Sequence, residues 1–191
     1  MAYGESYEKL TTALVEEHRE VFSLLSMEQL GSFIEAIAQA KNIFVMGAGR
    51  EGISLRAFAM RLAHLGKNTA WIWDDTTVGI RPGDLFIASD GRGDIGSFRY
   101  TFERVKQAGG NIAMFTANPD GPNVRAFADI PLFVHASAYK MKRDDVVPTI
   151  QMMGNQYEQH LYMLCDVIIM LLVEKLGLSY DDLEARHRNV E

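Results

Sequence analysis

The chain has 191 residues, of which 48% are apolar, and carries a formal net charge of −6, which together predict a globular protein with one sizeable core. This acidic balance excludes nucleic acid and anionic membrane surfaces as the expected main partners. The longest apolar run, near residues 167–173, is too short to span a bilayer, and residues 1–6 lack a signal-peptide pattern, so a cytoplasmic protein is predicted.

Residues 5–40 carry apolar side chains at helical spacing, which predicts two helices before the first strand. Ser26 is the predicted N-cap of the second helix, with Gln29 three residues further on. From residue 43 onward, apolar runs typical of strands alternate with amphipathic segments. The predicted strands are 43–46, 69–73, 85–89, 111–116 and 131–134, and the predicted helices are 52–65, 95–108, about 121–127 and about 155–176.

This alternation predicts an α/β fold in which a parallel sheet lies between layers of helices. Because no repeat or linker interrupts the pattern, residues 1–191 are predicted to form one domain. Its predicted parts are N-terminal helices at 5–40, a sheet with crossover helices at 43–134, and a C-terminal helix and tail at 150–191. Ligands of such sheets bind beyond the carboxyl ends of the strands, which selects the loops 47–52, 74–77, 90–97 and 116–121.

The first of these loops contains Gly47, Gly49 and Gly52 between a strand and a helix. Free backbone N–H groups and a helix N-terminus favour an anionic small molecule at such a turn. The spacing also fits the G-x-G-x-x-G fingerprint of dinucleotide-binding oxidoreductases, and Asp74 and Asp75 stand where that fingerprint needs an acid. Two preceding helices and the short remaining chain weigh against this alternative. A structural alternative is a tight turn that lets the helix pack close to the sheet.

A second glycine-rich turn, residues 88–97, also joins a strand to a helix. Asp90 and Asp94 in this turn would repel an anion, whereas Arg92 can pair with one. The structural alternative is that Asp94 caps the helix and Arg92 is solvated. Two strand–turn–helix units predict two walls of one site for a polar ligand.

Several titratable residues lie outside these turns. Glu158 falls in the first turn of the last long helix, where a carboxylate suits the helix dipole, although beside a sugar carbonyl it can act as a general base. His18 is predicted to be solvated, and His64 to end its helix. His187 lies in a tail of a kind that ordinarily frays. Cys165 is predicted to fill the core, and no histidine cluster has metal-ligand spacing, so no metal is predicted.

Several stretches together resemble a known family in order and spacing. They are Gly47-Ala48-Gly49-Arg50 with Gly52, the run Phe-Ala-Met-Arg-Leu-Ala-His-Leu-Gly at 58–66, Thr76-Thr77, Gly83-Asp84-Leu85, Thr116 with Asn118-Pro119-Asp120, and Arg186-His187-x-Asn189-x-Glu191. Across about residues 8–191 the chain is similar to the sugar isomerase (SIS) domain proteins, and most closely to the 6-phospho-3-hexuloisomerases.

The resemblance implies a three-layer α-β-α sandwich with a five-stranded parallel sheet, of flavodoxin-like type. It implies a homodimer or homotetramer whose active sites lie between subunits. It also implies aldose–ketose isomerisation of a sugar phosphate or related sugar, in which a base moves a proton between adjacent carbons through an enediol. Neither a metal nor an organic cofactor takes part in that reaction.

Residue roles are also implied by position within the resemblance. Glu158 corresponds to the family's base, and His187, or as a second choice His64, would assist ring opening or move protons on oxygen. The sugar-contacting loop maps to residues 47–52. The residues predicted to bind substrate are Gly47, Gly49, Arg50, Glu51, Thr76, Ser89, Asp90, Gly91, Arg92, Gly93, Asp94 and Ser97.

Two stretches depart from the family pattern. Glu51 replaces the usual serine of the first turn, and the usual phosphate loop Ser-Gly-Ser-Gly-Glu-Thr reads Asp-Gly-Arg-Gly-Asp-Ile at residues 90–95. A carboxylate about 4 Å from a phosphate costs several kcal/mol at intermediate dielectric, of which Arg92 offsets a part. The alternative is therefore a non-catalytic or re-purposed module that binds a non-phosphorylated or amino sugar through Glu51 and Asp90.

Overall fold

The computed structural model describes residues 3–190, which form a five-stranded, wholly parallel sheet covered by helices. The strands are β1 (Asn42–Met46), β2 (Asn68–Trp71), β3 (Leu85–Ser89), β4 (Asn111–Thr116) and β5 (Ile130–Phe133). They lie side by side in the order β2-β1-β3-β4-β5. This is the flavodoxin-like order, which differs from the 3-2-1-4-5-6 order of dinucleotide-binding folds. The predicted fold class is confirmed.

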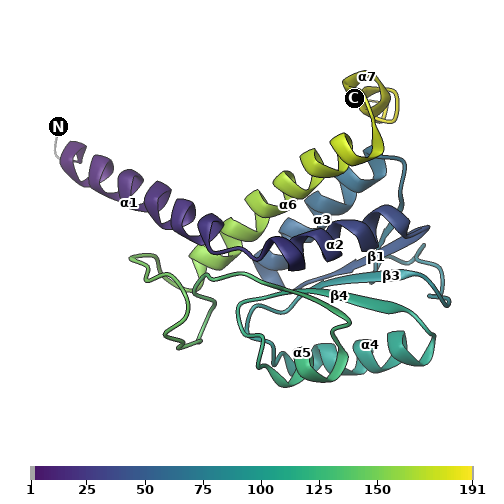
Figure 1. Ribbon diagram of the computed structural model, residues 1–191, viewed down its shortest axis with the longest axis horizontal. Coiled ribbons are helices and arrows are strands. Elements are labelled where there is room, and N and C mark those ends of the chain that lie inside the picture. The colour runs from purple at the N-terminus through teal and green to yellow at the C-terminus, as the bar shows by residue number, and fades with distance from the viewer. Residues whose placement is uncertain (1–2, 191) are drawn as a thin grey trace.

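Helices cover both faces of the sheet (Figure 1). They are α1 (Gly4–Ser23), α2 (Met27–Gln39), α3 (Gly49–His64), α4 (Gly96–Gln107), α5 (Pro122–Phe127), α6 (Asn155–Leu176) and α7 (Tyr180–Glu184). One core forms where α2, α3 and α6 pack on the sheet around Phe33 and Phe58, and Cys165 is buried there as predicted. The other core forms beneath α4 and α5, around Phe98 and Phe102. Most of α1 projects beyond these layers.

Two local predictions can be compared with the helix ends. Ser26 caps α2 as predicted, because its hydroxyl accepts a hydrogen bond of 3.3 Å from the Gln29 N–H. The helix after β1 begins at Gly49 rather than at residue 52, because the Gly52 N–H already donates to the Ala48 carbonyl at 3.2 Å and closes the first turn. Directly before the tail that contains His187, a short helix that was not predicted, α7, forms with a capping box between Ser179 and Asp182.

No single helix within residues 3–190 is long and apolar enough to cross a membrane. The pair α1 and α2 passes a test of length and composition only when taken together, and the two helices are bent by 82° at their junction.

The first glycine turn brings two backbone segments into direct contact, which confirms the tight-turn interpretation. A Cβ atom on Gly52 would lie 2.6 Å from the Gly47 carbonyl oxygen and 3.1 Å from the Trp71 ring. We expect Gly52→Ala to lower the free energy of unfolding by about 1–3 kcal/mol, because neither neighbour can move away freely. Gly31→Ala is the matched control: its position in α2 is open, so alanine should stabilise by about 0.5–1 kcal/mol. Equal urea midpoints for the two variants would contradict this packing.

Candidate active site

Three of the four predicted loops meet at the carboxyl edge of the sheet. The Ala117 N–H donates to the Gly91 carbonyl at 3.0 Å, and the Asn118 amide donates to the Arg92 carbonyl at 2.8 Å. The Gly91 N–H in turn donates to the Glu51 carboxylate at 3.2 Å. The first and second glycine turns are therefore adjacent walls, as the sequence predicts.

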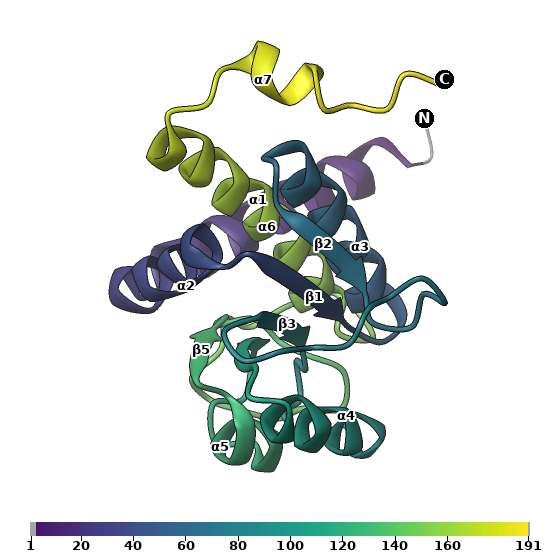
Figure 2. The same cartoon turned by 90° about the vertical axis from the view of Figure 1, so that its right-hand side faces the viewer.

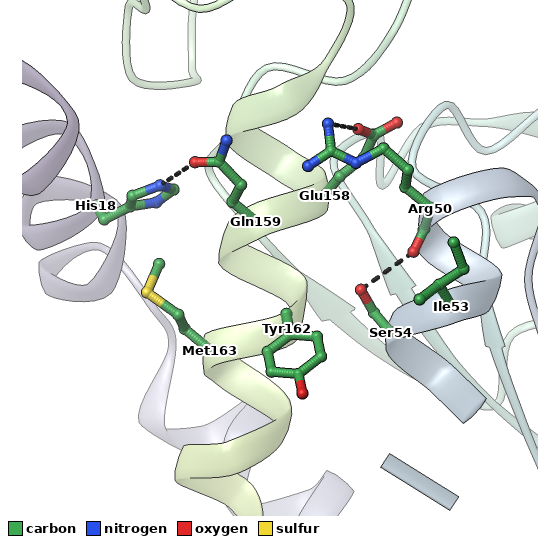
Figure 3. Close-up of a pocket in the computed structure, with 8 residues that line it drawn as sticks. All are labelled: His18, Arg50, Ile53, Ser54, Glu158, Gln159, Tyr162 and Met163. Atoms are coloured by element: carbon green, nitrogen blue, oxygen red, sulfur yellow. Dashed lines mark hydrogen bonds and ion pairs between the residues drawn. The ribbon is translucent and has the colours of Figure 1, made fainter. Parts of the chain in front are cut away.

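Glu158 lies where α6 meets the first glycine turn (Figure 3). Its carboxylate is 3.3 Å from the Arg50 guanidinium, which also donates to the Asn155 side chain at 2.6 Å. The Glu158 side chain is 18% exposed, so it is shielded yet reachable from solvent. Arg50 thus places a positive charge directly beside the predicted base.

Two cavities adjoin Glu158 and Arg50. One, of about 420 Å³, extends between α1, α3 and α6 and is lined by His18, Arg50, Ile53, Ser54, Glu158, Gln159, Tyr162 and Met163 (Figure 3). The other, of about 500 Å³, extends toward the second glycine turn and is lined by Ala48, Gly49, Arg50, Glu51, Arg92, Ile95, Tyr139, Met153, Asn155 and Glu158. Three residues that depart from the family pattern, Glu51, Arg92 and Ile95, line this second cavity.

Glu51 forms a hydrogen-bonded cluster on the wall of this second cavity. Its carboxylate accepts from the Ser89 hydroxyl at 2.6 Å and from the Gly91 N–H at 3.2 Å. Because Ser89 donates to Glu51, the Tyr157 hydroxyl donates to Ser89, at 3.0 Å. Burial, with a smaller contribution from the negative charges of Asp90 and Glu158, raises the pKa of Glu51 to about 7 against these hydrogen bonds.

This raised pKa makes stability depend on pH with a definite sign. Since the folded state holds the Glu51 proton more tightly than the unfolded state, the contribution of Glu51 to stability is fully present below about pH 4.5 and is lost as pH rises through about 7. Glu51→Gln keeps an acceptor oxygen and removes the charge. We expect it to raise the free energy of unfolding by about 1–3 kcal/mol at pH 8 and by much less at pH 4.5.

Urea unfolding at both pH values measures this difference. Glu8→Gln, on the exposed side of α1, is the control and should shift neither curve by a comparable amount. A stabilisation by Glu51→Gln of the same size at both pH values would contradict the raised pKa.

Asp90 and Asp94 lie differently from each other in the second turn. Asp90 is fully buried and accepts from the Asn123 amide at 2.7 Å and from the Ile95 N–H at 3.2 Å. Burial raises its pKa. Asp94 does not cap the helix, because Ile95 is the N-cap residue of α4; instead it forms a two-point ion pair with Arg92 at 2.8 and 3.0 Å. The alternative in which Arg92 is merely solvated is therefore wrong.

The remaining residues predicted to bind substrate either pack within the turns or lie away from Glu158. Gly47 and Gly93 serve the turns through close backbone packing, with Gly93 against Gly121. Thr76 lies in an exposed turn after β2, and Ser97 is exposed in the first turn of α4. Neither lines the two cavities that contain Glu158.

A buried polar network that the sequence did not reveal joins α1 to the segment before α6. The Glu17 carboxylate accepts from the Thr149 hydroxyl at 2.7 Å, the Ile150 N–H at 2.8 Å and the Gln151 amide at 2.9 Å. Next to it, His18 is buried and donates to Gln159 at 3.1 Å, so its predicted solvation is wrong. These partners are more than 130 residues away along the chain, and no local spacing signals them.

His64 and His187 come together at the opposite end of α3 and α6. Their ring centroids are 5.1 Å apart, beside a cavity of about 460 Å³ that Arg61 and Arg188 also line. In Figures 1 and 2, α7 lies beyond the C-terminal end of α6. A helix rises about 1.5 Å per residue, so Glu158 and the end of α6 at residue 176 are about 27 Å apart. Within one chain, the predicted base and His187 do not share a site.

Known proteins resemble this chain along nearly its whole length, although no protein-family model matches it. A 3-hexulose-6-phosphate isomerase of Bacillus subtilis (strain 168) is 33% identical over 167 residues, which are 87% of this chain and 89% of that protein. One of Mycobacterium gastri is 34% identical over 164 residues, covering 86% and 81%. A solved hypothetical protein of Methanococcus jannaschii, whose structure "infers a molecular function of 3-hexulose-6-phosphate isomerase", is 26% identical with a TM-score of 0.76 over 97% of this chain and 99% of that one. The chain therefore belongs to the 3-hexulose-6-phosphate isomerase family.

Proposed function

We propose that this protein isomerises a sugar phosphate by moving a carbonyl group between adjacent carbons, with 3-hexulose 6-phosphate as the substrate that its relatives' names suggest. The observation that carries the proposal is the position of the Glu158 carboxylate. It lies in the first turn of α6, 3.3 Å from the Arg50 guanidinium, and it lines cavities large enough for a hexose phosphate. Glycine turns from two parallel strands enclose this position.

The proposed reaction needs one base and one group that stabilises negative charge. Glu158 removes the proton from C2 of the 3-hexulose, and the electron pair moves to the C3 carbonyl oxygen, giving a 2,3-enediolate. The Arg50 guanidinium stabilises this oxyanion electrostatically. Transfer of a proton between the two oxygens and return of the Glu158 proton to C3 then leave the carbonyl at C2, as in fructose 6-phosphate. Both sugars are ketoses, although the chemistry equals that of an aldose–ketose isomerase.

We further propose that two copies of the chain form each complete site. The roles that the resemblance implies for Glu158 and His187 require both at one substrate, yet in one chain about 27 Å of helix lies between Glu158 and the end of α6, beyond which His187 is found. The projecting helix α1 and its N-cap residue Tyr3 carry exposed apolar side chains at helical spacing, namely Tyr3, Tyr7 and Leu10, which suit contact with a second copy. A homodimer or homotetramer in the cytoplasm is the proposed form.

Incubation of the purified protein with 3-hexulose 6-phosphate, followed by NMR, tests the activity. We expect conversion to fructose 6-phosphate. The competing function, a module that binds a neutral or amino sugar, has the weaker support, because the named relatives are phosphosugar isomerases. Unchanged phosphosugars together with thermal stabilisation by amino sugars alone would favour that competing function.

A further inference from the structure

The second glycine turn already holds carboxylates where it would hold a phosphate. The Gly91 N–H donates to Glu51, and the Ile95 N–H donates to Asp90. The N–H groups of Gly93 and Asp94 also act on the Asp90 carboxylate, where they counter the effect of burial on its pKa. Two backbone donors of this turn, the Gly91 and Ile95 N–H groups, are thus engaged by acidic side chains of the chain itself. A phosphate entering here would lose these donors and meet two carboxylates.

A separate basic cavity opens directly beside this turn. It measures about 270 Å³, and Arg92, Lys140, Lys142 and Arg143 line it, with Asp94 as the single acidic side chain on its wall. Arg92 also lines the cavity that contains Glu51 and Glu158, so the two cavities adjoin across this side chain.

The two lysines of this cavity, Lys140 and Lys142, carry positive charges that no ion pair in the described chain engages. Arg143 is engaged by Asp145 at 2.6 Å and Asp120 at 3.2 Å, whereas neither Lys140 nor Lys142 forms an ion pair within residues 3–190. Arg92 uses its Nε and Nη2 groups for Asp94, which leaves Nη1 for a ligand.

The segment that presents these lysines is fixed to the body of the protein. Arg143 donates to the Asn118 side chain at 2.7 Å, and the backbone of Gly154 packs against that of Tyr139. Lys140 adopts a φ of 55°, which is uncommon for a residue with a side chain. In this conformation its amine lies 5.1 Å from the centre of the Tyr139 ring, and Tyr139 also lines the cavity that contains Glu51 and Glu158. Lys140 is therefore held at the junction of the two cavities.

We infer that Lys140, Lys142 and the free edge of Arg92 bind the substrate's phosphate group in the basic cavity, in place of the glycine turn at residues 90–95. The sugar then lies in the adjoining cavity, with its reacting carbons toward Glu158. This inference rests on the proposed phosphosugar substrate. It reconciles that substrate with Glu51 and Asp90, because the carboxylates no longer face the dianion directly.

The double variant Lys140→Ala/Lys142→Ala tests the inference, with fructose 6-phosphate as the probe. We expect its KM and its Kd, the latter by calorimetry, to rise about 10- to 100-fold, because two charge-assisted contacts are lost. The kcat should stay within about threefold, since neither lysine touches the reacting carbons. Lys41→Ala, an exposed lysine before β1, is the matched control and should change neither constant. Both variants alter exposed side chains, and thermal melting verifies that they fold.

A third variant separates the basic cavity from the glycine turn. Glu51→Ser removes one of the carboxylates that engage the turn and frees the Gly91 N–H. We expect the double lysine substitution to cost less affinity in the Glu51→Ser background than in the wild type. An unchanged Kd in the double lysine variant would overturn the inference that these lysines bind the phosphate. If the wild type still turned over the substrate, the isomerase proposal would stand. Binding that depends on the lysines but is not followed by turnover would support the phosphate site and overturn the isomerase proposal.

Discussion

Glu158→Gln is expected to lower kcat by about 10²- to 10⁴-fold, because an amide cannot accept the proton that a general base must remove. Gln has nearly the same shape, and it can still accept a hydrogen bond from Arg50, whose guanidinium lies 3.3 Å from the carboxylate. The KM for a phosphosugar should therefore change little. Steady-state kinetics of conversion between 3-hexulose 6-phosphate and fructose 6-phosphate measures both constants.

The neighbouring Gln159 provides the matched control for this substitution. Its side chain lines the same cavity but bonds to His18 on α1 and has no place in the proton transfer (Figure 3). Gln159→Ala should retain kcat within about tenfold. A Glu158→Gln protein with more than a tenth of wild-type kcat would contradict the assignment of the base.

Mixing two inactive variants is expected to restore activity if each site takes Glu158 from one copy and His187 from another. We expect His187→Ala alone to lose about 10²-fold or more in kcat. Co-expression with Glu158→Gln in equal amounts should then recover about a quarter of wild-type activity, because random pairing leaves one intact site in each mixed pair. The measurement is the specific activity of the co-purified mixture, with each variant alone as the reference.

Complementation also distinguishes the shared site from a purely structural role of His187. His187 lies against His64 at the far end of α3, so its loss could act through local packing alone. In that case the mixed protein would be no more active than the sum of the separate variants. That result, together with a monomer by light scattering, would contradict the composite site.

The sequence predicted the elements that depend on local patterns. The glycine spacing at residues 47–52 indicated a strand–turn–helix unit, and the alternation of strands and helices predicted the parallel sheet. The start of α3 was misplaced by three residues, because the glycines of this stretch are typical of a turn, whereas the Gly52 N–H already bonds to the Ala48 carbonyl as in a helix. Local chemistry thus specified the fold and the position of Glu158 at the start of α6.

Contacts between distant segments could not be predicted in the same way. His18 was expected in solvent because its own helix shows a polar face there, but Gln159, 141 residues later, buries it. Asp90 and Glu51 stood out as unusual, yet only the structure reveals that they accept hydrogen bonds from the Ile95 and Gly91 N–H groups of the second glycine turn. Lys140 and Lys142 lie in a segment without periodicity, so no pattern linked them to the site.

Deuterium exchange in D2O tests the proposed carbonyl shift most directly. A 2,3-enediol formed with Glu158 as base exposes the C3 position of fructose 6-phosphate to exchange with solvent. We predict that the wild-type protein incorporates deuterium at C3, detected by NMR, and that Glu158→Gln does not. Deuterium at C1 would instead indicate a 1,2-enediol, and fructose 6-phosphate without label at any carbon after prolonged incubation would contradict the isomerase account.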